Sequence, residues 1–187
     1  MQIRRTLAKT FVNTCANILN LIYGYEGLNL LFKILPSRYI IYVITYFGGN
    51  VGKGTYIQCP LMIHNAGENK SSFSNLTIGD DSYIGRDCMF DLMGKISIGN
   101  QVTISHRAVF NTHTNAGKSP LINYVLKVTS GDIEINDGTY LGSNTTVLEN
   151  VVIGRKVIIG SKSLVNNNIP NKVTAYGIPC KVQKVNE

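Results

Sequence analysis

Residues 135–170 read INDGTY LGSNTT VLENVV IGRKVI IGSKSL VNNNIP, so that an apolar residue opens each group of six. A period of six matches neither the 3.6-residue period of a helix nor the two-residue period of a strand. It predicts a coil in which each hexad forms one side of a prism. A small or β-branched residue stands four positions after the apolar ones, as a corner of a narrow interior requires, at Thr139, Thr145, Val151, Val157 and Ser163.

The two hexads IGRKVI and IGSKSL, residues 153–164, resemble the hexapeptide repeat of the left-handed parallel β-helix acyltransferases. The resemblance extends over about residues 51–183 and is closest in pattern to the bacterial surface-polysaccharide O-acetyltransferases. It implies an all-β fold, a left-handed parallel β-helix. The left hand comes from the resemblance alone, because connections between parallel strands are usually right-handed.

The hexads divide the chain into three parts. They form groups of three, which predicts about five coils in a β-helix domain at residues 51–170. The interruptions fall between the third hexad of one coil and the first of the next, so they share one corner, and the longest is the loop 116–134. An N-terminal helical segment (1–50) and a short C-terminal tail (171–187) complete the organisation.

Residues 1–50 differ from the repeats, because their apolar residues follow mixed helical spacing and predict two or three helices. The uncharged run Tyr39–Gly49 is shorter than the ~20 residues that cross a bilayer. Two roles remain open for this segment. It either caps the first coil and contacts another subunit, or serves as an interfacial helix that holds the protein beside lipid-linked glycans.

The chain has 187 residues, 44% of them hydrophobic, and a formal net charge of +7. Its sequence contains no nucleic-acid-binding motif, so a phosphorylated small molecule or an anionic membrane surface is the expected partner. The four cysteines lie far apart without a Cys-x-x-Cys pair, which favours a reducing cytoplasm over a zinc site or a disulfide framework. We expect a cytoplasmic protein with peripheral contact at the inner face of the membrane through residues 1–50.

A single histidine opens the long loop in the sequence THTNAGKSPL, residues 112–121. Acyl transfer from a thioester to a hydroxyl or amine needs a base that titrates near neutrality, as an ordinary histidine does. The sequence resembles that of the polysaccharide acetyltransferases, which implies that His113 is the catalytic base. An ungapped alignment with the maltose- and galactoside-type O-acetyltransferases places their histidine at Asn115 instead. The structural alternative is a loop histidine that caps a turn.

Three polar residues on neighbouring coils are candidates to support His113 or to hold the acceptor. Asp91 and Asn111 share the second position of stacked hexads, and Glu149 lies one coil further on, beside His113. A carboxylate could orient the imidazole or bind a sugar hydroxyl. Exposed carboxylates on a solenoid are more often solvated, so both interpretations stay open.

The resemblance also implies that the pantetheine arm of coenzyme A lies in a groove between two subunits. The matching positions are Gly142, Ser143, Gly160 and Ser161, and the lysines that could meet the phosphates are Lys162 and Lys181. A backbone N–H near Gly142 could stabilise the oxyanion of the thioester. Each lysine alone could equally be a solvated charge.

The residues and the resemblance together predict an acetyl-CoA-dependent O-acetyltransferase of polysaccharide biosynthesis, acting as a homotrimer. His113 would take the proton from a sugar hydroxyl of a surface polysaccharide or its precursor. The acceptor would attack the thioester directly, because no cysteine or serine is evidently placed as a nucleophile. No metal and no nucleic acid are expected.

Three other functions remain open. An amino-sugar N-acetyltransferase would have the same fold and the same base. A γ-carbonic-anhydrase-like metalloprotein would use histidines across a subunit interface, which draws attention to His64 and His106. A non-catalytic scaffold would keep the solenoid and bind no coenzyme A.

Overall fold

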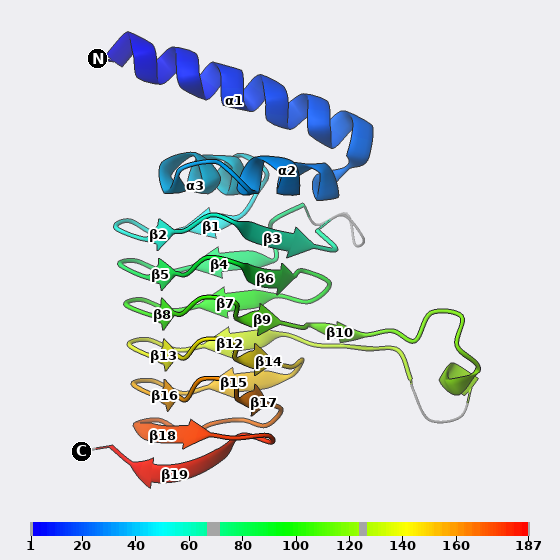
Figure 1. Ribbon diagram of the computed structural model, residues 1–187, viewed down its shortest axis with the longest axis vertical. Helices are drawn as coiled ribbons and strands as arrows, with labels where there is room; N and C mark the ends of the chain where they lie inside the picture. Colours follow the sequence, from blue (N-terminus) through cyan, green and yellow to red (C-terminus); the bar gives the residue numbers. More distant parts are fainter. Residues whose placement is uncertain (1, 67–71, 124–126, 187) are drawn as a thin grey trace.

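The chain folds into a stack of triangular coils closed at one end by helices, as the computed structural model shows (Figure 1). The structure describes residues 2–66, 72–123 and 127–186, so residues 124–126 of the predicted loop and the two terminal residues lie outside it. Consecutive strands of the chain lie on successive faces of the prism, and equivalent strands of neighbouring coils pair in parallel. This arrangement confirms the predicted parallel β-helix.

Three sheets form the faces of the prism, and each contains one strand from each of five coils. Face A consists of β1 (Asn50–Val51), β4 (Leu76–Ile78), β7 (Ile96–Ile98), β12 (Ile133–Ile135) and β15 (Val151–Ile153). Face B begins with β2 (Tyr56–Ile57), β5 (Tyr83–Ile84), β8 (Thr103–Ile104), β13 (Tyr140–Leu141) and β16 (Ile158–Ile159). Face C consists of β3 (Leu61–His64), β6 (Cys88–Asp91), β9 (Val109–Phe110), β14 (Thr146–Val147) and β17 (Leu164–Val165).

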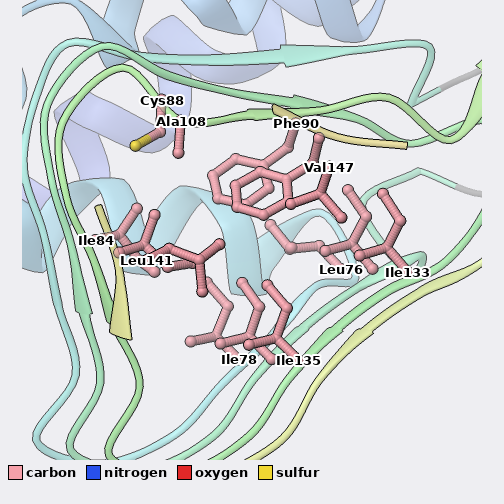
Figure 2. Packing of buried hydrophobic residues seen from close by; sticks show 14 of the residues in the cluster. Leu76, Ile78, Ile84, Cys88, Phe90, Ala108, Ile133, Ile135, Leu141 and Val147 are labelled. Atoms are coloured by element: carbon pink, nitrogen blue, oxygen red, sulfur yellow. The ribbon is translucent and has the colours of Figure 1, made fainter. Parts of the chain in front are cut away.

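The interior is built from columns of like residues, one from each coil. Figure 2 shows Ile78 and Ile135 in one column and Ile84 and Leu141 in another, the two strands of each pair lying on either side of a strand from the coil between them. The six apolar residues that open the hexads from 135 to 165 are at most 1% exposed. The small corner residues are buried as well, and the hydroxyls of Thr139 and Ser163 donate to turn carbonyls. The period of six is therefore the period of the core.

Phe90 and Phe110 stack inside face C, with ring centroids 4.9 Å apart and planes within 6° of parallel. Both are fully buried. Phe110→Ala should lower the free energy of unfolding by about 3–5 kcal/mol, because it removes most of a buried ring and leaves a cavity. Denaturant unfolding at one fixed protein concentration measures this loss. The matched control is Val109→Ala on the outer side of the same strand, and an equal loss there would contradict the assignment of the core.

The helices cover the open edge of the first coil. They are α1 (Gln2–Tyr23), the 3₁₀ turn η1 (Tyr25–Leu28), α2 (Asn29–Phe32) and α3 (Ser37–Tyr46). The side-chain amide of Asn29 pairs with both the N–H and the carbonyl of Ile63, and the Ser37 hydroxyl accepts from the N–H of Ile57. These hydrogen bonds pair backbone groups of the first coil that would otherwise remain unpaired at the edge of the sheets. Among the described residues, no helix is both long and apolar enough to cross a membrane.

Two boundaries differ from those expected from the sequence. In the tail, β18 (Val173–Tyr176) continues face B in parallel with β16, and only β19 (Lys181–Val185) reverses direction. In the loop, Ile133 and Glu134 already belong to β12, and the excursion begins at β10 (His113–Thr114). The hexad count misses both because strand pairing extends beyond the residues that keep the six-residue pattern.

Candidate active site

His113 lies at the corner where face C leads into face A of the next coil, here called the C–A corner. Its strand β10 pairs antiparallel with β11 (Thr129–Ser130), and these two strands form the stem of the long loop. Figure 1 shows the loop projecting away from the stack as an arm that carries η2 (Pro120–Asn123) near its tip. The base predicted from the sequence therefore stands where the arm leaves the coil.

Asp91 is the residue that His113 contacts. The Nδ1 atom of His113 lies 2.6 Å from Oδ2 of Asp91, which is the last residue of β6 one coil away. The histidine side chain is 25% exposed and the aspartate side chain 5%. One end of the imidazole is thus held by a nearly buried carboxylate while part of the ring faces solvent.

Neighbouring groups hold the Asp91 carboxylate in place. Oδ2 also accepts from the N–H and the hydroxyl of Thr112, and Oδ1 accepts from the amide of Asn65 at 2.7 Å and from the N–H of Met93. Burial acts to raise the pKa of Asp91, but the hydrogen bonds from Asn65, His113 and Thr112 together outweigh it and lower the pKa. Asp91 is therefore an anion at neutral pH.

The anionic partner determines which nitrogen of His113 carries the proton. A carboxylate can only accept, so the neutral imidazole is assigned its proton on Nδ1 and a lone pair on Nε2. Within the described part of the chain, Nε2 has no hydrogen-bond partner. The arrangement can thus accept a proton at Nε2 and stabilise the resulting imidazolium through Asp91.

Glu149, a second predicted helper, has a different position. Its Oε1 accepts from the hydroxyls of Thr114 at 3.2 Å and Thr129 at 2.8 Å, one from each strand of the loop stem. Glu149 therefore fastens the arm, and within the described residues it has no hydrogen bond to His113. Asn111 donates its backbone N–H to Val147, and its side chain is not among the described partners of His113.

Asn115 does not occupy the position of a base. Its side-chain Oδ1 accepts from the N–H of Gly117 at 2.8 Å, which closes a turn two residues beyond His113. An amide is also not basic at neutral pH. Of the two positions that the alignments offered, His113 is the one that contacts a carboxylate.

The predicted donor residues gather at a different corner, where face B leads into face C, here called the B–C corner. Ser143 and Lys162 stack there in consecutive coils, the N–H of Lys162 donating to the carbonyl of Ser143 at 2.9 Å. The tail turns beside them, because the N–H of Cys180 donates to Leu164, and Lys181 follows directly. The structure thus brings the predicted donor residues into one column, separated from His113 by the width of face C.

The glycines of this column are required by the stacking of coils. A Cβ atom on Gly142 would lie 2.5 Å from the N atom of Ser161, and one on Gly160 would lie 2.7 Å from Cβ of Tyr176. The N–H of Gly142 donates to the carbonyl of Ile159 at 2.8 Å. Pairing between parallel coils therefore uses the N–H of Gly142 itself, and an oxyanion donor among the backbone N–H groups near Gly142 stays a prediction.

Two basic or titratable residues of the B–C corner were missed as donor-site candidates. Arg107 occupies the same hexad position as Lys162, and both have left-handed backbone conformations, with φ of 60°. Nδ1 of His106 lies 3.2 Å from the hydroxyl of Ser143. The signal in the sequence was the shared hexad position, which places side chains one above another along a corner.

The three histidines have separate surroundings. His64 forms an ion pair with Glu26 at 3.1 Å, His106 contacts Ser143, and His113 contacts Asp91. Among the residues that the structure describes, no three His, Cys, Asp or Glu side chains converge as metal ligands would. The metalloprotein alternative therefore has no assembled site within the described chain.

Residues 132–167 match the family model described as bacterial transferase hexapeptide (six repeats). Three related proteins illustrate what a longer part of the sequence resembles. A galactoside O-acetyltransferase from Lactococcus lactis is 30% identical over 73% of this chain and 63% of its own length. A putative colanic acid biosynthesis acetyltransferase from Escherichia coli is 26% identical over 78% of this chain and 74% of its own length. A putative acetyltransferase from Staphylococcus aureus is 35% identical over 58% of this chain and 54% of its own length. The chain thus spans less than two thirds of the first and third relatives.

Solved structures show the same fold at lower sequence identity. A hexapeptide-repeat acetyltransferase from Vibrio cholerae superposes with a TM-score of 0.76, at 19% identity over 91% of this chain and 92% of that one. A maltose O-acetyltransferase from Clostridium difficile superposes with a TM-score of 0.75, at 24% identity over 92% of this chain and 91% of that one. A galactoside acetyltransferase in complex with coenzyme A has a TM-score of 0.72, at 21% identity over 92% of this chain and 83% of that one. The fold is the left-handed parallel β-helix.

Proposed function

We propose that the protein transfers acetyl from acetyl-coenzyme A to a sugar hydroxyl. Residues 132–167 match the bacterial transferase hexapeptide family, and a galactoside O-acetyltransferase is among the relatives. The observation that carries the proposal is the contact between His113 and the nearly buried Asp91 at the stem of the arm. A histidine oriented in this way is what acyl transfer to a hydroxyl requires.

The chemistry of this proposal follows from the orientation of His113. Nε2 takes the proton of the acceptor hydroxyl while the hydroxyl oxygen forms a bond to the carbonyl carbon of the thioester. The carbon–sulfur bond breaks, the electron pair leaves with sulfur, and the proton passes from Nε2 to the thiolate. Asp91 stays ionised throughout and stabilises the imidazolium.

Direct transfer is preferred over an acyl-enzyme route for a physical reason. Burial raises the pKa of Cys88 to about 11 and also raises that of Cys180, so both stay protonated thiols at neutral pH. Cys15 and Cys59 belong to the helical cap and the first coil, away from the C–A corner of His113. No serine hydroxyl is hydrogen-bonded to His113 within the described residues.

The separation of the two corners supports a site shared between copies of the chain. The column with Ser143, Lys162 and Lys181 lies across face C from His113, whereas the arm projects away from its own stack (Figure 1). A cyclic homotrimer would place the C–A corner and arm of one copy against the B–C corner of the next. Arg107, Lys162 and Lys181 would then supply cations for the phosphates of coenzyme A, and Ser143 a hydroxyl for the pantetheine arm.

The acceptor class is proposed from the relatives. A galactoside and a maltose O-acetyltransferase are named among them, and a third relative is assigned to colanic acid biosynthesis. These names favour a sugar hydroxyl of a surface polysaccharide or its precursor over an amine. His113 belongs to the stem of the arm, so the arm and its stem are the segment expected to select the acceptor.

The test is the release of free thiol from acetyl-coenzyme A over a panel of sugars and nucleotide sugars, with product mass and ester lability in alkali as readouts. We expect acceptor-dependent thiol release and an alkali-labile acetyl group, from an assembly with the mass of three chains. An alkali-stable product would instead indicate N-acetylation. Coenzyme A binding without turnover of any sugar would count against sugar transfer, and no binding at all would leave a scaffold.

A further inference from the structure

The helix α1 packs on the protein through polar contacts and a short apolar contact. The ammonium group of Lys9 lies 5.2 Å from the centre of the Tyr42 ring, and the amide of Asn17 donates to the hydroxyl of Tyr46 at 3.4 Å. Both tyrosines belong to α3. Among the residues of α1 whose burial is described, 6–23, Val12 and Ala16 are buried, and Leu19 is partly buried against the core.

The opposite side of α1 is apolar and exposed. Leu7, Phe11, Ile18 and Ile22 are separated by four, seven and four residues, which places them on one face of a helix. Their exposed fractions are 65%, 70%, 51% and 61%, and that of the adjacent Leu21 is 86%. We call these five residues the outer stripe. In a helix of an ordinary soluble domain the apolar stripe faces the core, whereas α1 has a second apolar stripe that faces outward.

The outer stripe has no cover within the described chain. Figure 1 shows α1 at the extreme end of the molecule, with α2 and α3 between it and the first coil. Contiguous exposed apolar patches of this kind mark surfaces that bind another partner. The question is which partner the surrounding charges favour.

The charge of the helix favours an anionic partner. The sequence of α1 contains Arg4, Arg5 and Lys9 and neither aspartate nor glutamate. The whole segment 1–50 has five basic residues and one acidic residue, Glu26. A second copy of α1 laid against the outer stripe would bring like charges together, whereas anionic lipid headgroups would neutralise them. The helix is too polar to cross a bilayer, as its asparagines and threonines show.

We propose that the outer stripe of α1 binds the surface of an anionic phospholipid bilayer, with the helix lying in the plane of the interface. Leu7, Phe11 and Ile18 would enter the boundary between headgroups and acyl chains, and the net positive charge of segment 1–50 would attract the anionic headgroups. The stack of coils then stands away from the membrane, because α1 is the terminal layer of the molecule (Figure 1). The inference does not depend on the proposed acetyl transfer.

The experiment is co-sedimentation of the full chain with sucrose-loaded vesicles of phosphatidylglycerol and phosphatidylcholine in equal parts. We expect the wild type to pellet with these vesicles, to pellet less with pure phosphatidylcholine, and to be released as salt rises from ~0.1 M to ~1 M. Phe11→Gln should weaken binding at least about tenfold, because a large apolar group leaves the interface without a change of charge.

The matched control is Thr10→Gln, one residue away on the polar side of α1, which should bind as the wild type does. Circular dichroism of both variants verifies the helix, which an exposed position should not disturb. Wild-type protein that fails to pellet would overturn the proposal, and so would equal binding by Phe11→Gln. A change in assembly mass in Phe11→Gln without any vesicle binding would assign the outer stripe to a second copy instead.

Discussion

His113→Ala is expected to lower kcat for acetyl transfer by about 10²–10⁴-fold, the usual contribution of a positioned general base. The variant removes Nε2 of His113, the atom proposed to take the proton of the acceptor hydroxyl. The Asp91 carboxylate keeps its bonds from Thr112 and Asn65, so the coil should remain folded. Thiol release from acetyl-coenzyme A, measured at saturating acceptor, gives the loss.

Two controls separate loss of the base from loss of the site. Coenzyme A binding and assembly mass should be unchanged, because the contacts proposed for coenzyme A come from Ser143 and the basic residues of the B–C corner and not from His113. Asn115→Ala should retain activity within a few-fold, since the Asn115 side chain only closes a turn onto Gly117. Full activity in His113→Ala, or a collapse in Asn115→Ala of the same size, would contradict the assignment of the base.

Asp91→Asn is expected to lower kcat by about 10²-fold with little change in KM. The neutral amide oxygen can still accept from Nδ1 of His113, but it no longer provides the negative charge that stabilises the imidazolium. The amide NH₂ would face Asn65, whose own amide can turn to accept from it. Asp91 is thus a positioning residue, and its isosteric replacement leaves the contacts of the coil largely intact.

A spectroscopic readout distinguishes positioning from mere support of the fold. In the wild type, the proton shared between Nδ1 and the carboxylate should give a low-field imidazole N–H resonance, and Asp91→Asn should move or abolish it. An unchanged resonance together with lost activity would show that Asp91 acts only through the structure of the coil.

The same variant tests the lowered pKa of Asp91. A folded-state pKa below the ordinary value of about 3.9 means that ionised Asp91 stabilises the native protein above that pH, and that this contribution disappears as the pH falls through the folded-state pKa. Wild type should therefore be more stable than Asp91→Asn at neutral pH, and the difference should shrink in acid. Denaturant unfolding at both pH values measures it; a difference that grows in acid would contradict the direction of the shift.

The fold was predictable because its signal is local and repeated. The hexads from Ile135 to Val165 are read in order along the chain, and each apolar residue points into the same narrow interior. The position of His113 at a corner followed from the same count. The ends of the loop and tail did not, because Ile133 and Thr174 enter strands through pairing with a neighbouring coil. Such pairing has no signature in the residues themselves.

The partner of His113 required the tertiary structure. Asp91, Asn111 and Glu149 all stood near the histidine by hexad position. Asp91 contacts it and Glu149 fastens the arm, whereas Asn111 has a backbone hydrogen bond to Val147 and is not among the described partners of His113. The hexad count shows which coil a side chain belongs to, and neighbouring coils are about 4.8 Å apart. A hydrogen bond requires a specific distance and direction, which the count does not provide. The outer stripe of α1 has the same origin, because helical spacing identifies an apolar face but only packing shows that it points outward. The sequence by itself therefore determined the repeat, the corner and the candidate for the base, while the tertiary structure decided their partners.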